Sequence, residues 1–310
     1  MTWTANNIPA QAGRRVIITG ANSGIGFHAA LELARNGAEV ILPARSETKA
    51  EDAVRRIRAE VPQAKLVPAL LDLASLSSVR RFAAMIAERF PGPSIDVLIN
   101  NAGVMAVPMR EVTEDGFERQ FATNFLGPFA LTALLFPHLK PTAGTRIVTL
   151  ASIIVHQGKI DFDNLQGERK YVPLGGAYAQ SKLADLIFAL EFHRRLSRVG
   201  SPIASIAAHP GIAVTNLQVH LSGLYKLLGR ILAPVIAQSA QQGSLPELFA
   251  ATSPDAVPGG YYGPNGVREC RGFPAPGRIP AAAVDETLAR TLWQTAERLT
   301  GIPFDVTTRE

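Results

Sequence analysis

The stretch from Val16 to Gly26 reads Val-Ile-Ile-Thr-Gly-Ala-Asn-Ser-Gly-Ile-Gly, and it decides the predicted fold. Its first three residues are apolar and β-branched, which is typical of a strand buried on both faces of a parallel sheet. Gly20, Gly24 and Gly26 then turn the chain directly into a predicted helix. Glycines allow close backbone approach, and a helix N-terminus offers free N–H groups to an anion. We interpret the stretch as a cradle for a dinucleotide pyrophosphate, with an ordinary strand–helix turn as the alternative.

Length and composition indicate a chain that buries a large core. Of its 310 residues, 47% are hydrophobic and 18% are charged, and no linker composition divides them. We therefore expect one domain over residues 1–310, with a cofactor-binding and catalytic core at about 13–211 and a substrate lid at about 212–245. The net charge of +5 is spread over isolated arginine pairs without interleaved aromatic residues, so nucleic-acid binding is not expected.

The sequence also bears on location. Cys270 is the only cysteine, which excludes a disulfide within the chain, and residues 1–11 lack the basic head and apolar run of a signal peptide. No run of about 18 apolar residues suggests a membrane span. We expect a cytoplasmic protein. An apolar stretch at 221–236, broken by charged residues, glycine and proline, is expected to cover the substrate, with a membrane-surface helix as the alternative.

Alternating apolar strands and amphipathic helices predict an α/β fold with a single doubly wound, Rossmann-type parallel sheet and helices on both faces. Further strands are expected at 38–42, 66–71, 95–99, 146–150, 205–208 and 256–263, and helices at 47–60, 75–90, 116–139, 178–196 and 285–299. Pro68 lies in the third strand, and because proline cannot donate to a sheet ladder, it favours an edge position. Phe117, Phe121, Phe125 and Phe129 recur every four residues, which indicates core packing or a dimer face.

The end of the second strand bears on the choice of cofactor. In such a sheet an acid here would accept from a free adenosine 2′-hydroxyl, whereas an arginine would pair with a 2′-phosphate. Ala44 stands where the acid would be sought, and Arg45 follows it. We therefore predict NADP(H) rather than NAD, with a plain surface arginine as the alternative. After the fourth strand, Asn100-Asn101-Ala102-Gly103 suits a backbone that approaches a ligand closely, although the same residues also suit a turn.

Tyr178 and Lys182 are four residues apart in a predicted helix, which places their side chains one turn apart on the same face. An unperturbed phenol has a pKa of about 10, and a neighbouring cation favours its ionised form. We expect the lysine to lower the pKa of the phenol. The pair then suits proton exchange during alcohol–carbonyl interconversion.

Two other kinds of site find little support. His156, His209 and His220 share no metal-ligand spacing with each other or with Cys270, so no metal site is expected. Ser152 is not surrounded by a Gly-x-Ser-x-Gly elbow, which argues against a hydrolase triad.

Taken together, these motifs resemble the short-chain dehydrogenase/reductase family over about residues 13–300. The matching residues are Thr19-Gly20-x-x-x-Gly24-Ile25-Gly26, Asp72, Asn100-Asn101-Ala102-Gly103, Asn124, Ser152, Tyr178-x-x-x-Lys182 and Pro210-Gly211. The resemblance implies that Tyr178 is the catalytic acid/base and that Lys182 lowers its pKa and holds the nicotinamide ribose. It further implies that Ser152 hydrogen-bonds the substrate oxygen and that Asn124 anchors a water.

The same resemblance implies a set of cofactor contacts. Asp72 would meet the adenine, and Thr215 would contact the carboxamide side of the nicotinamide. The full expected set is Gly20, Asn22, Ser23, Gly24, Ile25, Gly26, Arg45, Asp72, Leu73, Asn101, Ala102, Gly103, Tyr178, Lys182, Pro210, Gly211 and Thr215.

Two departures from the common pattern point to one branch of this family. Ser152 and Tyr178 lie 26 positions apart, about twice the usual spacing. The extra segment at 156–167 is similar to the retinol dehydrogenase and protochlorophyllide reductase-like branch, which generally uses NADP(H) and so agrees with Arg45. In addition, Ala151 replaces the serine that commonly precedes the catalytic one.

We therefore expect an NADP(H)-dependent oxidoreductase acting on a small alcohol or carbonyl substrate, which the apolar 221–236 stretch suggests is lipophilic or aromatic. The alternatives are an NAD-preferring member of the same family and a non-catalytic NADP-binding module that acts by protein contact. The resemblance implies dimer or tetramer assembly through the helices around Phe121 and Leu186, while this branch also admits monomers.

Overall fold

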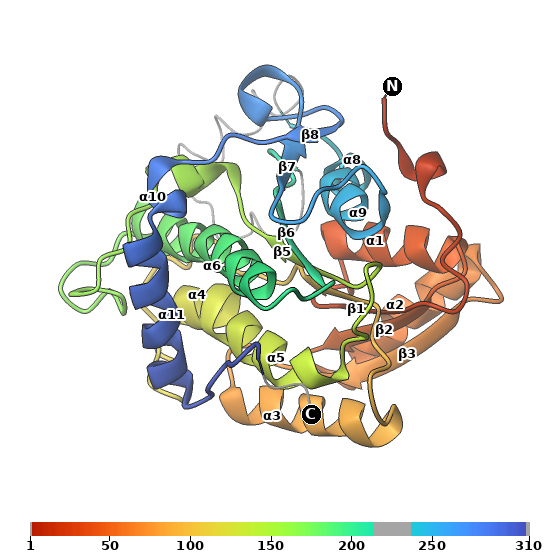
Figure 1. The fold of residues 1–310 in the computed structure, drawn as a ribbon, viewed down its shortest axis with the longest axis horizontal. Coiled ribbons are helices and arrows are strands. Elements are labelled where there is room, and N and C mark those ends of the chain that lie inside the picture. The colour runs from red at the N-terminus through yellow and green to blue at the C-terminus, as the bar shows by residue number, and fades with distance from the viewer. Residues whose placement is uncertain (1, 214–236, 308–310) are drawn as a thin grey trace.

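A single eight-stranded sheet forms the centre of the computed structural model, which describes residues 2–213 and 237–307 (Figure 1). The strand order is β3-β2-β1-β4-β5-β6-β7-β8, and every neighbouring pair is parallel except β7 with β8. The strands are β1 (Arg15–Ile18), β2 (Glu39–Ala44), β3 (Lys65–Leu70), β4 (Val97–Asn100), β5 (Arg146–Leu150), β6 (Ala204–Ala208), β7 (Tyr261–Pro264) and β8 (Pro274–Pro276). The predicted doubly wound α/β fold is confirmed, and so is the edge position of the strand that contains Pro68.

Helices cover both faces of this sheet (Figure 1). Helices α1, α2 and α9 pack on one face, whereas α3, α5 and α6 pack on the other, with α11 lying against α6. Their bounds are α1 (Gly24–Arg35), α2 (Glu47–Glu60), α3 (Leu76–Arg89), α4 (Arg119–Phe121), α5 (Gly127–Leu135), α6 (Ala179–Arg198), α8 (Ala240–Gly243), α9 (Leu245–Thr252), α10 (Ala281–Val284) and α11 (Glu286–Thr300).

The apolar run of β1 follows from this layering. Val16 and Ile18 point into the core beneath α1, and Ile17 points into the core beneath α5 and α6. All three are fully buried. A strand buried on both faces needs apolar side chains at every position, so the run at 16–18 has no polar alternation.

Three predicted elements differ from the structure. The expected helix at 116–139 is interrupted, because a π-helical turn at Ala122–Leu126 separates α4 from α5. The helix expected from Tyr178 is preceded by another π-helical turn at Pro173–Tyr178. The last expected strand is shorter, at Tyr261–Pro264, and the antiparallel β8 beyond it was not predicted.

Most of the predicted lid, including the 221–236 stretch and Thr215, lies outside the described residues. The part from 240 to 245 forms α8, which packs against α1, and the start of α9, which packs on the sheet. These residues belong to the layer beside α1. No helix within 2–213 or 237–307 is long and apolar enough to cross a membrane.

Candidate active site

The glycine turn joins β1 to α1 at the carboxyl edge of the sheet. Gly20 and Gly24 have positive φ angles of 71° and 59°, which favour glycine. A Cβ on Gly26 would lie 2.3 Å from Asn101 Nδ2 and 2.9 Å from the Gly20 carbonyl oxygen. A side chain is therefore disfavoured at each of these three glycine positions. Ser23 precedes α1 without capping it, so the first N–H groups of the helix stay available to an anion.

The ends of β1 and β4 are tied together beside this turn. Asn101 Nδ2 donates to the Thr19 carbonyl at 2.7 Å, and the Asn101 and Ala102 amides each donate to Thr19 Oγ1 at 3.0 Å. The Asn101 side chain thus holds the turn in place, and its expected contact with the cofactor stays a prediction. Its neighbour Ala102 lies 2.9 Å from where a Gly20 Cβ would be, so the two strand ends approach closely.

Tyr178 lies at the start of α6 with its phenol buried near the side chains of Ser152 and Lys182. Its ring is 5% exposed, and its hydroxyl is hydrogen-bonded by the Ser152 side chain, which follows β5. Lys182 is on the same helix face one turn later and is also 5% exposed. The structure therefore brings the predicted serine, tyrosine and lysine together and supports Ser152 as the serine that faces the phenol.

The expected fall in the phenol pKa is not found. Burial raises the pKa of Tyr178 above its ordinary value, although the Lys182 ammonium and the Ser152 hydrogen bond both act to lower it. A carboxylate at Asp185 adds to the rise. The prediction considered only the cation; it missed the cost of ionising a phenol away from water.

The Lys182 ammonium has two hydrogen-bond acceptors in the structure. Its Nζ donates to the Leu150 carbonyl and to Asp185 Oδ2, each at 2.8 Å. A Cβ on Gly103 would lie 3.6 Å from this Nζ and 3.1 Å from Asn124 Oδ1. The lack of a side chain at Gly103 thus leaves the space beside the ammonium open, where a nicotinamide ribose would fit.

Asn124 lies in the π-helical turn, and its side chain forms three hydrogen bonds, with Val104 and Ser181. Its Nδ2 donates to the Val104 carbonyl at 3.0 Å and to Ser181 Oγ at 2.9 Å, while its Oδ1 accepts from the Val104 amide at 2.8 Å. Both Nδ2 hydrogens are therefore used, whereas Oδ1 keeps a second lone pair with which it could accept from a water. π-helical turns recur at functional sites.

At the end of β6, His209 positions the Pro210–Gly211 turn. Gly211 has a φ of 64°, its amide donates to His209 Nδ1 at 3.2 Å, and its Cβ would lie 2.3 Å from the Cys270 carbonyl oxygen. His209 Nε2 therefore carries the proton and donates to Glu269 Oε2 at 2.9 Å. Hydrogen bonds from His209, and secondarily from Arg278, lower the pKa of Glu269 to about 2.

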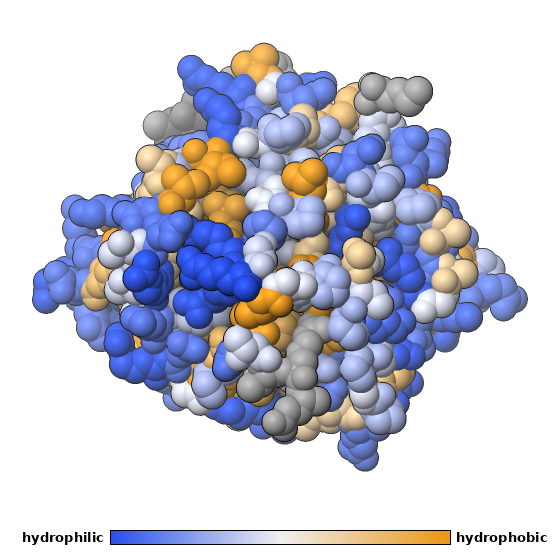
Figure 2. All heavy atoms as spheres, viewed as in Figure 1, coloured by the Kyte–Doolittle hydropathy of each residue, from blue (hydrophilic) through white to orange (hydrophobic). Residues whose placement is uncertain are grey.

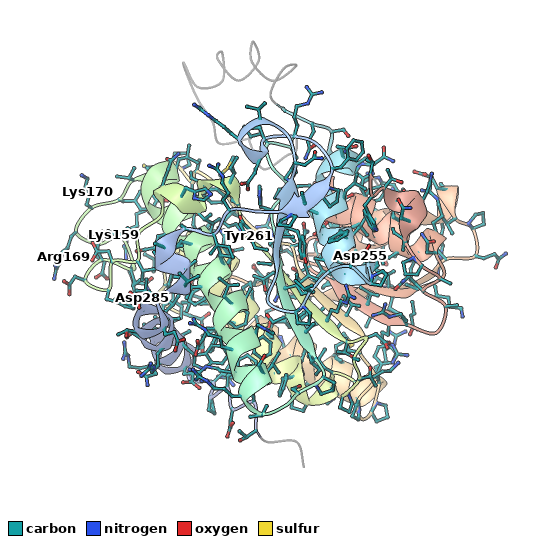
Figure 3. All side chains as sticks on the ribbon, turned by 45° about the horizontal axis from the view of Figure 1, so that its top comes forward. Lys159, Arg169, Lys170, Asp255, Tyr261 and Asp285 are labelled. Carbon is teal, nitrogen blue, oxygen red and sulfur yellow. The ribbon has the colours of Figure 1, made fainter. Side chains whose placement is uncertain are left out.

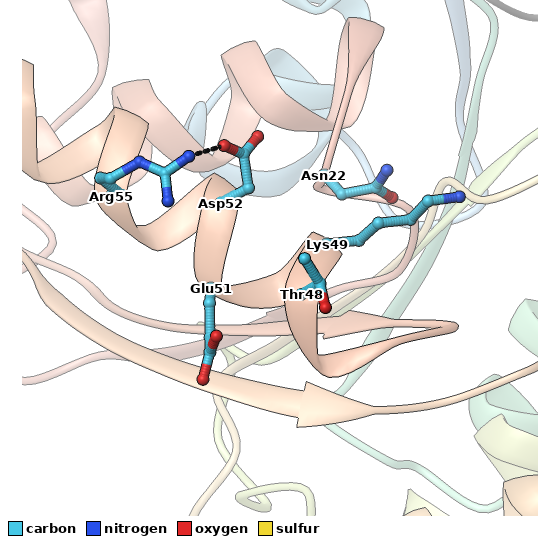
Figure 4. Close-up of a pocket in the computed structure, with 6 residues that line it drawn as sticks. All are labelled: Asn22, Thr48, Lys49, Glu51, Asp52 and Arg55. Atoms are coloured by element: carbon cyan, nitrogen blue, oxygen red, sulfur yellow. Dashed lines mark hydrogen bonds and ion pairs between the residues drawn. The ribbon is translucent and has the colours of Figure 1, made fainter.

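The expected adenosine end of the site is more exposed to solvent than the end that holds Tyr178 and Lys182. Arg45 follows β2 and is exposed, and Asn22 and Lys49 line a cleft of about 310 Å³ together with Thr48, Glu51, Asp52 and Arg55 (Figure 4). Arg55 is paired with Asp52. At the end of β3, Asp72 Oδ1 accepts from the Ala74 amide at 2.9 Å, and the neighbouring Leu73 is buried.

Sequence reasoning missed three residues of this site. Lys49 lies one turn into α2 and was noticeable only as a cation four positions after Arg45. Tyr261, from β7, is buried, and its hydroxyl donates to the Ser152 carbonyl at 3.4 Å (Figure 3). Asp185 was visible three positions after Lys182, but its burial against the ammonium was not.

Comparisons with known proteins show the family of this chain. The model of the short chain dehydrogenase family matches residues 14–223. The chain is 41% identical to retinol dehydrogenase 13 of Homo sapiens over 96% of this chain and 89% of that protein. It is 39% identical to polyprenol dehydrogenase of Mus musculus over 95% of this chain and 86% of that protein.

Solved structures show the same likeness. The fold matches that of an uncharacterized protein from Mycobacterium paratuberculosis with a TM-score of 0.81 and 39% identity, over 98% of this chain and 99% of the other. A protein from Beutenbergia cavernae, described as an NAD(P)-dependent gluconate 5-dehydrogenase with NADP bound at low occupancy, matches with a TM-score of 0.60 and 26% identity, over 81% of this chain and 95% of the other. The chain belongs to the short-chain dehydrogenase family, in its retinol dehydrogenase-like branch.

Proposed function

We propose that this oxidoreductase uses NADP(H) to interconvert an alcohol and a ketone or aldehyde on a lipophilic small molecule. The observation that carries the proposal is the buried Tyr178 phenol, hydrogen-bonded by Ser152 and followed one turn later by Lys182. The names of relatives support the substrate class, since retinol and polyprenol are lipophilic alcohols.

Tyr178, Ser152 and Lys182 have different roles in this proposal. The bound cofactor supplies or accepts the hydride. In the reductive direction Tyr178 donates its proton to the carbonyl oxygen, which Ser152 holds by a hydrogen bond. Lys182 binds the ribose through the N–H that faces the open space at Gly103, and its charge stabilises the phenolate left behind.

Replacing Tyr178 by phenylalanine tests the acid/base role. Tyr178→Phe should lower kcat by about 10²–10⁴-fold, because the proton donor is lost while the packing is kept. NADPH binding, followed by cofactor fluorescence, should stay nearly unchanged. Tyr262→Phe is the matched control, since Tyr262 is also a buried tyrosine, but its hydroxyl accepts from the Val257 amide. Full turnover by Tyr178→Phe would remove the residue from this role.

Two cations support NADP(H) over NAD(H). Arg45 directly follows β2, and Lys49 lines the adjoining cleft with Asn22 (Figure 4). Such groups suit a 2′-phosphate, which NAD lacks. The relative from Beutenbergia cavernae was solved with NADP.

Parallel titrations of NADPH and NADH test the cofactor choice. Arg45→Ala should weaken NADPH binding about tenfold, equivalent to about 1.4 kcal/mol, and leave NADH binding unchanged. Lys49→Ala should act in the same direction. Arg58→Ala, which removes an exposed cation from the same helix, serves as the control. Equal loss of both cofactors, or of neither, would refute the phosphate contact.

A further inference from the structure

Helix α6 carries a buried carboxyl group that the proposed proton transfer does not use. Asp185 lies one turn after Lys182 and is 1% exposed. Its Oδ2 accepts from Lys182 Nζ at 2.8 Å, so the ammonium and the carboxylate form an ion pair away from solvent. A buried ion pair costs desolvation energy and is weak evidence for a role in stability. Its position directly behind the lysine suggests a different role.

The ion pair leaves one N–H donor of the Lys182 ammonium available to a ligand. An ammonium has three N–H donors, and two of them are used by the Leu150 carbonyl and Asp185. The third faces the space that a Gly103 side chain would fill. Asp185 therefore fixes the direction of the ammonium without occupying the side on which the ribose is proposed to bind.

The pair also changes the field at the phenol. A lone ammonium would favour the phenolate of Tyr178, but a carboxylate behind it cancels part of that charge. Both effects act on Tyr178: Lys182 lowers the pKa of its phenol and Asp185 raises it. Charges interact strongly at a buried site because little water screens them.

The surroundings of Asp185 add no other charge from the described residues. Its own helix supplies Lys182 and Tyr178, and Tyr261 of β7 also faces Tyr178. Lys182 is the only charged group that acts on the pKa of Asp185 among the described residues. On the face of the sheet toward α5 and α6, the paired ends of β4 and β5 carry the neutral Asn100 and Thr149. The π-helical turn at 122–126 contributes only the neutral Asn124.

Asp185 is itself poised to change its charge. Burial raises the pKa of Asp185 to about 7 against the opposing effect of Lys182. Its Oδ1 has no hydrogen-bond partner among the described residues, so only one of its oxygens is stabilised as an anion. Above neutral pH the carboxylate is charged and opposes the lysine, whereas below it the lysine acts alone.

We propose that Asp185 is a positioning residue that offsets the charge of Lys182 and thereby keeps Tyr178 protonated above neutral pH, which favours carbonyl reduction. This inference rests on the proposed acid/base role of Tyr178. It assigns a direction to the site: a phenol that keeps its proton is a donor to a carbonyl, whereas a phenolate accepts a proton from an alcohol.

Asp185→Asn tests the proposal, because the amide oxygen can still accept from Lys182 while the negative charge is lost. In this variant the fall of the carbonyl reduction rate with rising pH should move to lower pH by about one unit, as expected when one charge near a titrating group is removed. Alcohol oxidation above neutral pH should rise by up to about tenfold for the same shift. Below neutral pH the variant and the wild type should converge.

Asp96→Asn is the matched control, since Asp96 is also buried and pairs with a lysine, Lys140, at 2.8 Å, but at the opposite end of the sheet. It should leave the profile in place. A purely structural role for Asp185 predicts the same unmoved profile in Asp185→Asn, and that result, or a shift to higher pH, would overturn the proposal. If Asp185→Asn does not fold, Asp185→Ser provides a smaller neutral replacement.

A measurement without substrate separates this proposal from the proposed function. The ultraviolet absorbance of phenolate is titrated in the wild type, in Asp185→Asn and in each combined with Tyr178→Phe, so that the difference isolates Tyr178. The phenolate of Asp185→Asn should appear at lower pH than that of the wild type. A lowered titration without any turnover would support the charge effect and count against the enzyme assignment; turnover with an unchanged titration would refute the charge effect alone.

Discussion

At the residue scale, Glu247 is a second buried carboxyl group, on the face of the sheet opposite Asp185. It is 1% exposed in α9, and neither of its carboxyl oxygens has a hydrogen-bond partner among the described residues. Burial raises the pKa of Glu247 well above its ordinary value. The side chain is therefore protonated in the folded protein under conditions in which the unfolded chain would ionise it.

This difference predicts how stability depends on pH. A pKa raised by folding gives a contribution that is complete below the unfolded pKa and is lost as pH rises toward the folded one. Glu247→Gln cannot titrate, so its free energy of unfolding relative to the wild type should rise by about 1.4 kcal/mol per pH unit above the unfolded pKa, with no such rise in acid. Urea unfolding at several pH values measures it. The exposed Glu88→Gln should show no such trend, and a constant gap for Glu247→Gln would contradict the argument.

The positions of single site residues were predicted from the sequence, whereas the pKa of the phenol was not. Gly20, Gly24 and Tyr178-x-x-x-Lys182 were predicted from local spacing, because a turn and a helix fix their geometry. The lowering effect of Lys182 on the phenol pKa was predicted, but burial and Asp185, which raise that pKa, were not, since both depend on packing against the sheet.

At the scale of elements, the two strand prolines also show what local sequence predicts and what depends on neighbouring strands. Pro68 was expected at a sheet edge and lies there, in β3. Pro43 lies in β2, which is an interior strand with β1 on one side and β3 on the other. Pairing of β2 with β1 ends at Ile41, so at Pro43 the only paired strand is β3. The rule that proline avoids interior strands therefore depends on how far each neighbour extends.

The two π-helical turns were not predicted, because their apolar spacing also suits a continuous α-helix. In the first, the three hydrogen bonds of Asn124 to Val104 and Ser181 hold the turn from outside the helix. The second, at Pro173–Tyr178, is anchored by Gln120, whose Nε2 donates to the Pro173 carbonyl at 3.0 Å and to Tyr171 Oη at 2.9 Å. These contacts join distant segments, so the local pattern carries no sign of them.

The segment between Ser152 and Tyr178, which identified the branch, is also held by hydrogen bonds to residues 107–120. Tyr171 donates to the Val107 carbonyl at 2.8 Å, and the Glu118 amide donates to Gln166 Oε1 at 2.7 Å. Its basic residues Lys159, Arg169 and Lys170 lie on the outer side, away from Tyr261 (Figure 3). The segment therefore supports the turn that carries the phenol.

At the scale of the whole molecule, α11 covers the helices expected to form an oligomer. Phe121 and Leu186 are fully buried within the chain. Trp293 of α11 lies with its ring centroid 5.2 Å from that of Phe129 and 5.7 Å from that of Phe188. Over α11 the outer surface is mostly hydrophilic (Figure 2). The aromatic stripe is core, and an interface through these helices would first require α11 to leave.

We therefore expect the protein to be a monomer in solution, because the apolar face that could join two copies is already buried by its own C-terminal helix. Light scattering coupled to size-exclusion chromatography measures the mass directly. A dimer that persists on dilution would contradict this expectation.

The sequence by itself determined the order of strands and helices, the glycine turn, and the residues that the carboxyl edge of the sheet would carry. Each of these follows from local periodicity or from the conformational limits of glycine and proline. Only the tertiary structure decided how those residues act together: that Asp185 lies behind Lys182, that Asn124 is held by Val104, and that α11 closes the core. The reason is physical. Burial, and with it the pKa of a phenol or a carboxyl group, is set by contacts between residues far apart in the chain, and no local pattern encodes the water that those contacts exclude.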